Sequence, residues 1–218
     1  MIRINELKLP LDEDEQELYR LAAKALKIGE RHIRELTICK KSVDCRKKDD
    51  IKFIFSVDVA LDIDEKRVAS KAGNRVSLSE KSVYTLPPVK RKSTLRPVIV
   101  GFGPAGMFAA LTLTEAGLSP IIIERGETVD ERTASVKSFW RTRVLNPESN
   151  VQFGEGGAGT FSDGKLTTGI KDKRCRRVFE KFCEHGAPSE IMYSATPHIG
   201  TDRLAGVVKA IRKTVEER

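Results

Sequence analysis

Apolar and polar positions along residues 1–86 follow strand and helix periods in turn. Apolar residues from Leu18 to Leu26 recur at i, i+3, i+4, i+7 and i+8, which predicts an amphipathic helix with Asp12 or Asp14 as its cap. Alternation in the stretch after Ile51 predicts a strand with one face more buried than the other. The pattern places strands at 2–9, 33–43, 51–61 and 83–86, and helices at 18–26 and 64–72. The order β-α-β-β-α-β predicts a small α+β module of the ferredoxin-like, split type.

The pattern changes at Pro97, where a short β-branched run predicts a strand buried on both faces. A helix is expected directly after it, with Gly117 as its C-terminal stop, and a second strand is expected over 119–123. Three more helices are expected, over 129–144, around 175–183 and after Thr201, which is a good N-cap residue.

These elements divide the chain into a module at 1–86, a proline-stiffened linker at 87–96 and a second domain at 97–218. The fold class is therefore α/β: an incomplete Rossmann-type βαβ domain preceded by the small α+β module. Two parallel strands and a few helices do not close a dinucleotide fold. We therefore expect the chain to be the N-terminal part of a longer enzyme.

A glycine motif joins the first strand of the second domain to its helix. In G-x-G-x-x-G, Gly101 permits the tight turn, Gly103 lets backbone approach a pyrophosphate, and Gly106 lets helix and strand pack closely. Free N–H groups and the positive end of the helix dipole then face the phosphates. Glu124 ends the next strand about 20 residues later, where a carboxylate accepts hydrogen bonds from ribose hydroxyls. The spacing predicts an adenine dinucleotide site.

A second glycine-rich loop lies within residues 150–166. Gly156, Gly157 and Gly159 let backbone pass close to a flat ring system, and N–H groups there can stabilise negative charge. The alternative is an ordinary glycine-rich crossover.

Composition and charge narrow the protein class. The chain has 218 residues and a net charge of +8, of which +6 belongs to residues 1–96, partly in short runs such as Lys90-Arg91-Lys92. Such runs are typical of solvated loops, and no aromatic residues interleave with them, so nucleic-acid binding is not favoured. No apolar run approaches the ~20 residues needed to span a bilayer, the first residues lack the apolar core of a signal peptide, and the four cysteines are widely spaced. We expect a cytoplasmic protein with reduced thiols and no metal site.

The sequence resembles the NAD(FAD)-utilising or FAD-dependent dehydrogenases, which are flavoproteins with two dinucleotide-binding domains. The resemblance rests on GFGPAGMFAALTLTEAGLSPIIIERG, on NVQFGEGGAGTFSDGKLTT and on ELTICKKSVDCRKK in the N-terminal module. It implies an oxidoreductase that transfers hydride through FAD, with NAD(P)H as a candidate electron donor, and a flavin-side position for residues 154–162. The implied cofactor-binding residues are Gly101, Gly103, Pro104, Ala105, Gly106, Glu124, Arg125, Gly156, Gly157, Gly159, Thr160 and Ser162.

No residue is assigned as catalytic. His198, in a Pro-His-Ile-Gly loop that the family pattern shares, is the strongest of the three histidines, and His185 is expected at a helix C-terminus. Cys175 and Cys183 fall on the apolar face of a helix, which favours core packing over a redox pair. Two alternatives stay open: an NAD(P)-binding domain, and a non-catalytic module that binds RNA or a partner through its basic N-terminal unit. The substrate and the oligomeric state are not predicted.

Overall fold

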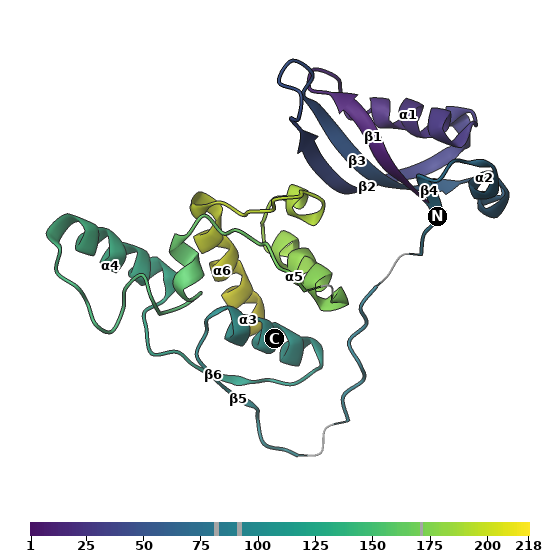
Figure 1. Ribbon diagram of the computed structural model, residues 1–218. Coiled ribbons are helices and arrows are strands. Elements are labelled where there is room, and N and C mark those ends of the chain that lie inside the picture. The colour runs from purple at the N-terminus through teal and green to yellow at the C-terminus, as the bar shows by residue number, and fades with distance from the viewer. Residues whose placement is uncertain (81–82, 91–92, 171) are drawn as a thin grey trace. The chain divides into compact units, whose positions relative to one another are not determined.

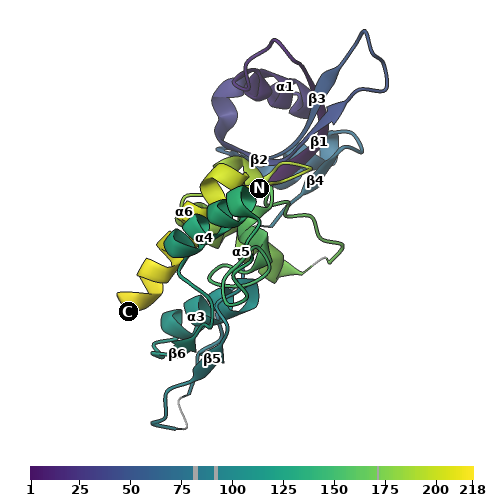
Figure 2. The same ribbon diagram turned by 90° about the vertical axis from the view of Figure 1, so that its left-hand side faces the viewer.

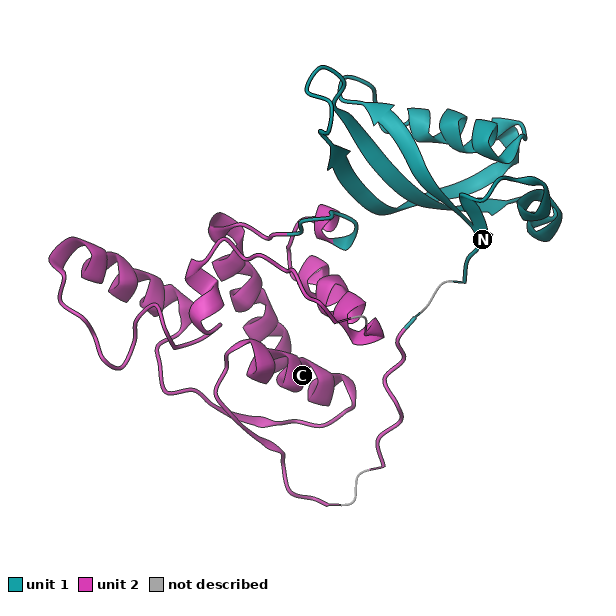
Figure 3. Ribbon diagram, in the orientation of Figure 1, with its two compact units in different colours: residues 1–83, 192–197 teal, residues 84–191, 198–218 magenta. Residues whose placement is uncertain are grey.

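The protein has a mixed α/β structure. The computed structural model describes residues 1–80, 83–90, 93–170 and 172–218. The chain divides into two compact units (Figure 3): unit 1 comprises residues 1–83 and 192–197, and unit 2 comprises residues 84–191 and 198–218. Part of the linker expected at 87–96, together with Arg91 and Lys92 of the basic run, lies outside the described residues.

Unit 1 is a four-stranded antiparallel sheet with the strand order β2-β3-β1-β4. β3 lies between β1 and β2 and is antiparallel to both, so β1 and β2 are parallel to each other. Figures 1 and 2 both show α1 along one face of this sheet. The elements follow the predicted order: β1 (Ile2–Pro10), α1 (Glu17–Leu26), β2 (Ile33–Asp44), β3 (Lys52–Leu61), α2 (Glu65–Lys71) and β4 (Val76–Leu78), with a 3₁₀ turn at Glu30–His32.

The apolar stripe of α1 and the alternating residues of the strands form the core of unit 1. Its fully buried members include Leu18 on α1, Ile4 on β1 and Phe55 on β3. Gln16, rather than Asp12 or Asp14, is the N-cap of α1, and the carboxylate of Asp14 accepts the Gln16 N–H at 2.7 Å. The acidic residue therefore stabilises the turn that leads into the helix, two residues before the cap.

The last strand of unit 1 differs from the expectation. β4 forms at Val76–Leu78, where it pairs with β1, and residues 83–86 form no strand. A three-residue edge strand is defined by its partner and not by its own alternation, so the pattern pointed to the wrong segment. Unit 1 gains a further edge contact from residues 192–197: the Lys41 N–H donates to the Tyr193 carbonyl, and the Ala195 N–H donates to the Lys41 carbonyl.

The described residues of unit 2 form a parallel two-stranded sheet, four α-helices and two short 3₁₀ helices, Ala158–Phe161 and Ser189–Met192, the last residue of which belongs to unit 1. β5 (Val98–Val100) runs into α3 (Pro104–Glu115), which returns to β6 (Ile121–Ile123) beside β5. Gly117 has φ +74° and follows the end of α3, as expected of a helix stop. The core gathers around α3 and α6, with Met107, Leu111, Val208 and Ile211 buried. The other helices are α4 (Val129–Thr142), α5 (Lys173–Glu184) and α6 (Thr201–Glu216).

The expectation that the first strand of this domain is buried on both faces is wrong. Val100 is 82% exposed, and Val98 and Ile123 are also exposed, whereas Ile99 and Ile122 pack against the core. Only one face of the two-stranded sheet is covered by helices in this structure.

Two helix starts show how local sequence sets the elements of unit 2. α4 begins with a capping box in which the Thr128 side chain and the Glu131 side chain each accept the other's backbone N–H. α6 is capped by Gly200, so Thr201 is its first residue and not its cap. Among the described residues, we find no helix that combines the length and apolarity needed to cross a membrane.

Candidate functional site

The first glycine loop has the geometry that its sequence predicts. Gly101 has φ +94°, and its N–H donates to the Ile123 carbonyl at 2.7 Å. A Cβ on Gly106 would lie 2.0 Å from the Gly101 carbonyl oxygen, so only glycine allows helix and turn to meet there. A Cβ on Gly103 would meet only the Gly157 Cα, at 3.8 Å. Gly103 is therefore not required by the packing of its own loop.

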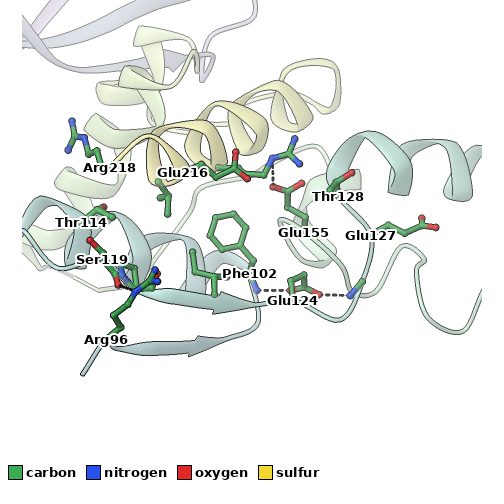
Figure 4. A pocket seen from close by; sticks show the side chains of 15 residues that line it. Arg96, Phe102, Thr114, Ser119, Glu124, Glu127, Thr128, Glu155, Glu216 and Arg218 are labelled. Atoms are coloured by element: carbon green, nitrogen blue, oxygen red, sulfur yellow. Dashed lines mark hydrogen bonds and ion pairs between the residues drawn. The ribbon is translucent and has the colours of Figure 1, made fainter. Parts of the chain in front are cut away.

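Glu124 ties the end of β6 to this loop. Its Oε2 accepts the Phe102 N–H at 2.6 Å, and its Oε1 accepts the Gly126 N–H at 2.9 Å (Figure 4). A carboxylate has about four acceptor positions, so two remain for other donors. The residue expected to bind a ribose thus also fixes the strand end.

The second glycine loop lies directly against the first. The Gly156 N–H donates to the Phe102 carbonyl at 2.8 Å. A Cβ on Gly157 would lie 2.8 Å from Pro104 Cδ and 3.4 Å from Gly103 Cα. We call the exposed or half-buried residues at this contact and directly beside it in the sequence the glycine surface: Gly103, Pro104, Ala105, Gly157, Ala158 and Gly159. Two segments about 50 residues apart in the sequence therefore present one surface without large side chains.

Buried side chains support the second loop. Gly154, Gly156 and Gly157 all have positive φ, at +113°, +83° and +69°. Thr160 is buried beneath them, and its hydroxyl lies 3.5 Å from Arg132, which is fully buried on α4. Thr160 therefore faces the interior, whereas Ser162 is exposed and its hydroxyl donates to the Gly159 carbonyl at 2.8 Å.

A cavity of about 780 Å³ begins at Glu124 and extends between β6 and α6. It is lined by apolar side chains such as Phe102 and Ile122 and by charged ones such as Glu155 and Arg212 (Figure 4). The residues of the glycine surface are not among those that line it. The cavity therefore reaches the end of β6 at Glu124 but does not include the glycine surface.

Glu155 is the most buried carboxylate of this region, at 3% exposure. Its Oε2 accepts the Val129 N–H at 2.5 Å, which places a negative group at the N-terminus of α4. Its Oε1 lies 3.2 Å from Arg212 Nε, but the N–H is not directed at it, so this contact is ionic and not a hydrogen bond. Burial raises the pKa of Glu155, while the Val129 N–H and the Arg212 charge act in the opposite direction.

Arg125 directly follows Glu124 in the sequence. Its guanidinium stacks over the Phe153 ring at 4.3 Å from the ring centre, and its Nε lies 3.7 Å from a Glu148 carboxylate oxygen. The side chain is exposed, so a planar ligand has access to it. Its expected place beside an adenine stays a prediction.

The remaining candidates lie apart from the glycine surface or are engaged elsewhere. His198 is exposed and forms a β-bridge with Lys165, and His185 bonds to Lys181 and Thr214. Cys183 packs against the core of unit 2. All four cysteines are free thiols, and the described part of the chain contains no cluster of three or more side chains suited to a metal ion.

Sequence reasoning did not single out Arg132 or Glu155. The signal for Arg132 was present, because it occupies the same helical stripe as Val129 and Val136, both of which are buried. A charged residue in an apolar stripe indicates a buried polar contact. Nothing local indicated that Glu155 would cap α4, because that contact joins residues 26 positions apart.

Comparisons with known proteins give two relatives and one family model. The model, described as "Domain of unknown function (DUF8436)", matches residues 1–60, which lie in unit 1. The chain is 49% identical over 217 residues to an uncharacterised protein of Clostridium beijerinckii. That alignment covers 99% of this chain and 40% of the relative, so the chain spans about 40% of the relative's length.

The second relative matches a shorter segment. Over 65 residues the chain is 40% identical to the dual trans-enoyl reductase/FAD-dependent monooxygenase tazHJ of Aspergillus terreus. This segment is 28% of the chain and 9% of that protein.

Proposed function

We propose that unit 2 binds FAD across the glycine surface and serves as part of an FAD-dependent oxidoreductase. The observation that supports this most strongly is the meeting of the two glycine loops, where Gly103 and Gly157 approach each other without a side chain between them. A Cβ at Gly103 would enter this surface without disturbing the loop's own packing. This is the pattern expected of a glycine that makes room for a ligand.

The groups present suit the parts of a dinucleotide. The turn at Gly103 and the first turn of α3 direct backbone N–H groups and the positive end of the helix dipole at a diphosphate. Glu124 keeps acceptor positions for ribose hydroxyls at the end of β6. The backbone of Gly157 and Gly159 leaves room for a flat ring. The residues therefore fit the cofactor that the family resemblance implies.

Bound flavin would supply hydride transfer, and this chain's residues would bind and orient it. The glycine surface excludes side chains from the diphosphate and the ring, and Glu124 fixes the adenosine end. The short match to an FAD-dependent monooxygenase is compatible with this assignment. NAD(P)H as electron donor and a cytoplasmic location remain parts of the proposal. No catalytic residue or substrate is proposed.

The competing assignment keeps the site and changes the ligand to NAD(P). Titrating the purified chain with FAD, NADH and ADP, followed by calorimetry, separates the two. We expect ADP and FAD to bind, with FAD at least about tenfold tighter than NADH, or ~1.4 kcal/mol. Tighter binding of NADH would favour the nicotinamide assignment. Binding of none of the three ligands at millimolar concentration would refute a dinucleotide site in this chain.

A further inference from the structure

The second glycine loop is organised around one buried cation. Arg132 lies in the first turns of α4 with 0% exposure. Its guanidinium donates to four backbone carbonyls of the loop segment, through Nε to Asn150 at 2.8 Å, Nη1 to Glu155 at 2.7 Å and Gly157 at 2.8 Å, and Nη2 to Val151 at 3.1 Å. One side chain thereby fixes the course of eight consecutive residues.

Other contacts show that the loop is built to accommodate this side chain. A Cβ on Gly154 would lie 2.8 Å from Arg132 Cδ, and Gly154 has φ +113°. The guanidinium carbon lies 4.9 Å from the centre of the Phe161 ring, which covers it from the far end of the loop. The glycine and the aromatic ring thus enclose the arginine from two sides.

Within the described part of the chain, Arg132 donates to backbone carbonyls and to the Thr160 hydroxyl and not to a carboxylate; Arg96 also donates to carbonyls, but Arg96 is exposed whereas Arg132 is fully buried. Among the described residues, none of the ion pairs that the structure forms includes it. Burial lowers its pKa, and the charges of Glu124 and Glu155 act the other way. A planar fork with five donors can hold several carbonyls at once, whereas an ammonium group cannot match that geometry.

We propose that Arg132 is a positioning residue of the dinucleotide site: it draws the loop's carbonyls inward and so holds Gly157 against Gly103. This inference rests on the proposed function. Because the carbonyls point toward Arg132, the opposite side of the loop is left for the ligand. Arg132 acts through the loop and does not touch the ligand. The effect is specific to the ring side of FAD, because the first loop keeps its own geometry through Gly101 and Gly106.

Three variants test this: Arg132→Met, Arg132→Lys and, as the matched control on the exposed face of the same helix, Arg141→Met. Hydrogen exchange without ligand is expected to rise in peptides covering 150–162 in both Arg132 variants and to stay unchanged at 101–118. FAD affinity is expected to fall at least about tenfold, whereas ADP affinity, which depends on the first loop, falls less than about threefold. The control variant Arg141→Met is expected to bind FAD and ADP with wild-type affinity.

The ratio of FAD to ADP affinity separates positioning from general stability. A purely structural role would lower both affinities together with the unfolding transition of unit 2, and this result would overturn the proposal. Wild-type FAD affinity in Arg132→Lys would also overturn it, because the carbonyl contacts need the fork. If the Arg132 variants fail to fold, Gly154→Ala displaces the arginine without removing it. We expect this variant to show the same selective loss of FAD binding. A wild-type ratio of FAD to ADP affinity in Gly154→Ala would contradict the inference.

The two proposals fail in different ways. If the wild-type chain binds neither FAD nor ADP, the proposed function is wrong, whatever the exchange data show. If the wild-type chain binds FAD and the Arg132 variants bind it equally well, the dinucleotide site stands and the positioning role is wrong.

Discussion

The two glycine loops of unit 2 are both held in a defined shape, but by different kinds of interaction. In the first loop, local sterics set the turn, and Glu124 adds one contact to the Phe102 N–H: a Cβ at Gly106 would lie 2.0 Å from the carbonyl oxygen of Gly101, five residues earlier. In the second, long-range polar contacts decide it, because Arg132 binds carbonyls 18 to 25 positions away. A loop that is fixed mainly by local packing can be recognised from its sequence motif. A loop fixed by a distant side chain needs the structure.

Gly106→Ala is the substitution expected to disrupt the first loop most severely. Its added Cβ meets backbone on the facing turn, which cannot move aside as a side chain can. We expect unit 2 to lose about 3 kcal/mol of stability or more. Urea unfolding followed by the fluorescence of Trp140, the only tryptophan of the chain, measures this in unit 2. A loss below about 1 kcal/mol would contradict the steric account.

Gly103→Ala tests the same loop without breaking it. The backbone at Gly103 has φ −75°, and the new Cβ meets only Gly157 Cα at an ordinary 3.8 Å, so stability is expected to change by less than about 0.5 kcal/mol. The methyl group occupies the glycine surface, so FAD and ADP affinities are both expected to fall about tenfold or more.

The control for Gly103→Ala is Gly206→Ala on the exposed face of α6, where a Cβ meets no atom within 4 Å. It is expected to stabilise the helix by about 0.5–1 kcal/mol and to leave affinity unchanged. Equal affinities of the Gly103 variant and the wild type would show that the glycine has no ligand to accommodate.

The second loop is expected to respond to pH through Glu155. Because burial raises the pKa of Glu155, its carboxyl group keeps its proton to a higher pH in the folded state than in the unfolded state, where the pKa is near 4.5. Between about pH 4.5 and the folded pKa, the folded state binds more protons than the unfolded state does. The contribution of Glu155 to the free energy of unfolding therefore decreases as the pH rises through this range. The stability of the wild type relative to Glu155→Gln should therefore decrease over this range.

Urea unfolding of both proteins at several pH values measures that difference. Glu148→Gln, which alters an exposed carboxylate near the same loop, serves as the control and should track the wild type. If the stability of the wild type relative to Glu155→Gln instead increases with pH, the Val129 N–H and Arg212 outweigh burial.

The smallest effect is expected from Gly159→Ala. A Cβ there meets no atom within 4 Å and the backbone has no positive φ, so stability should change by less than about 0.5 kcal/mol. We expect a few-fold loss of FAD affinity and no change for ADP, because this glycine lies on the ring side of the proposed site. Calorimetric titration with both ligands checks it; a parallel loss of ADP affinity would place Gly159 near the diphosphate instead.

The sequence predicted what depends on neighbouring residues. The turn at Gly101, the stop at Gly117 and the carboxylate at the end of β6 all follow from patterns within a few residues. The strand at Val76–Leu78 was missed because pairing with β1 defines it, whereas the apolar residues at 83–86 lack such a partner strand among the described residues. The exposure of Val100 was missed because burial depends on what covers the sheet.

In the proposed site, both glycine loops contact one ligand. Hydrogen exchange of the intact chain with and without FAD tests this most directly, because each loop is observed separately. We expect FAD to slow exchange in peptides covering both 101–110 and 153–162 and to leave exchange in the strands of unit 1 unchanged. Slowed exchange at one loop alone, or at neither loop with FAD at millimolar concentration, would contradict this expectation.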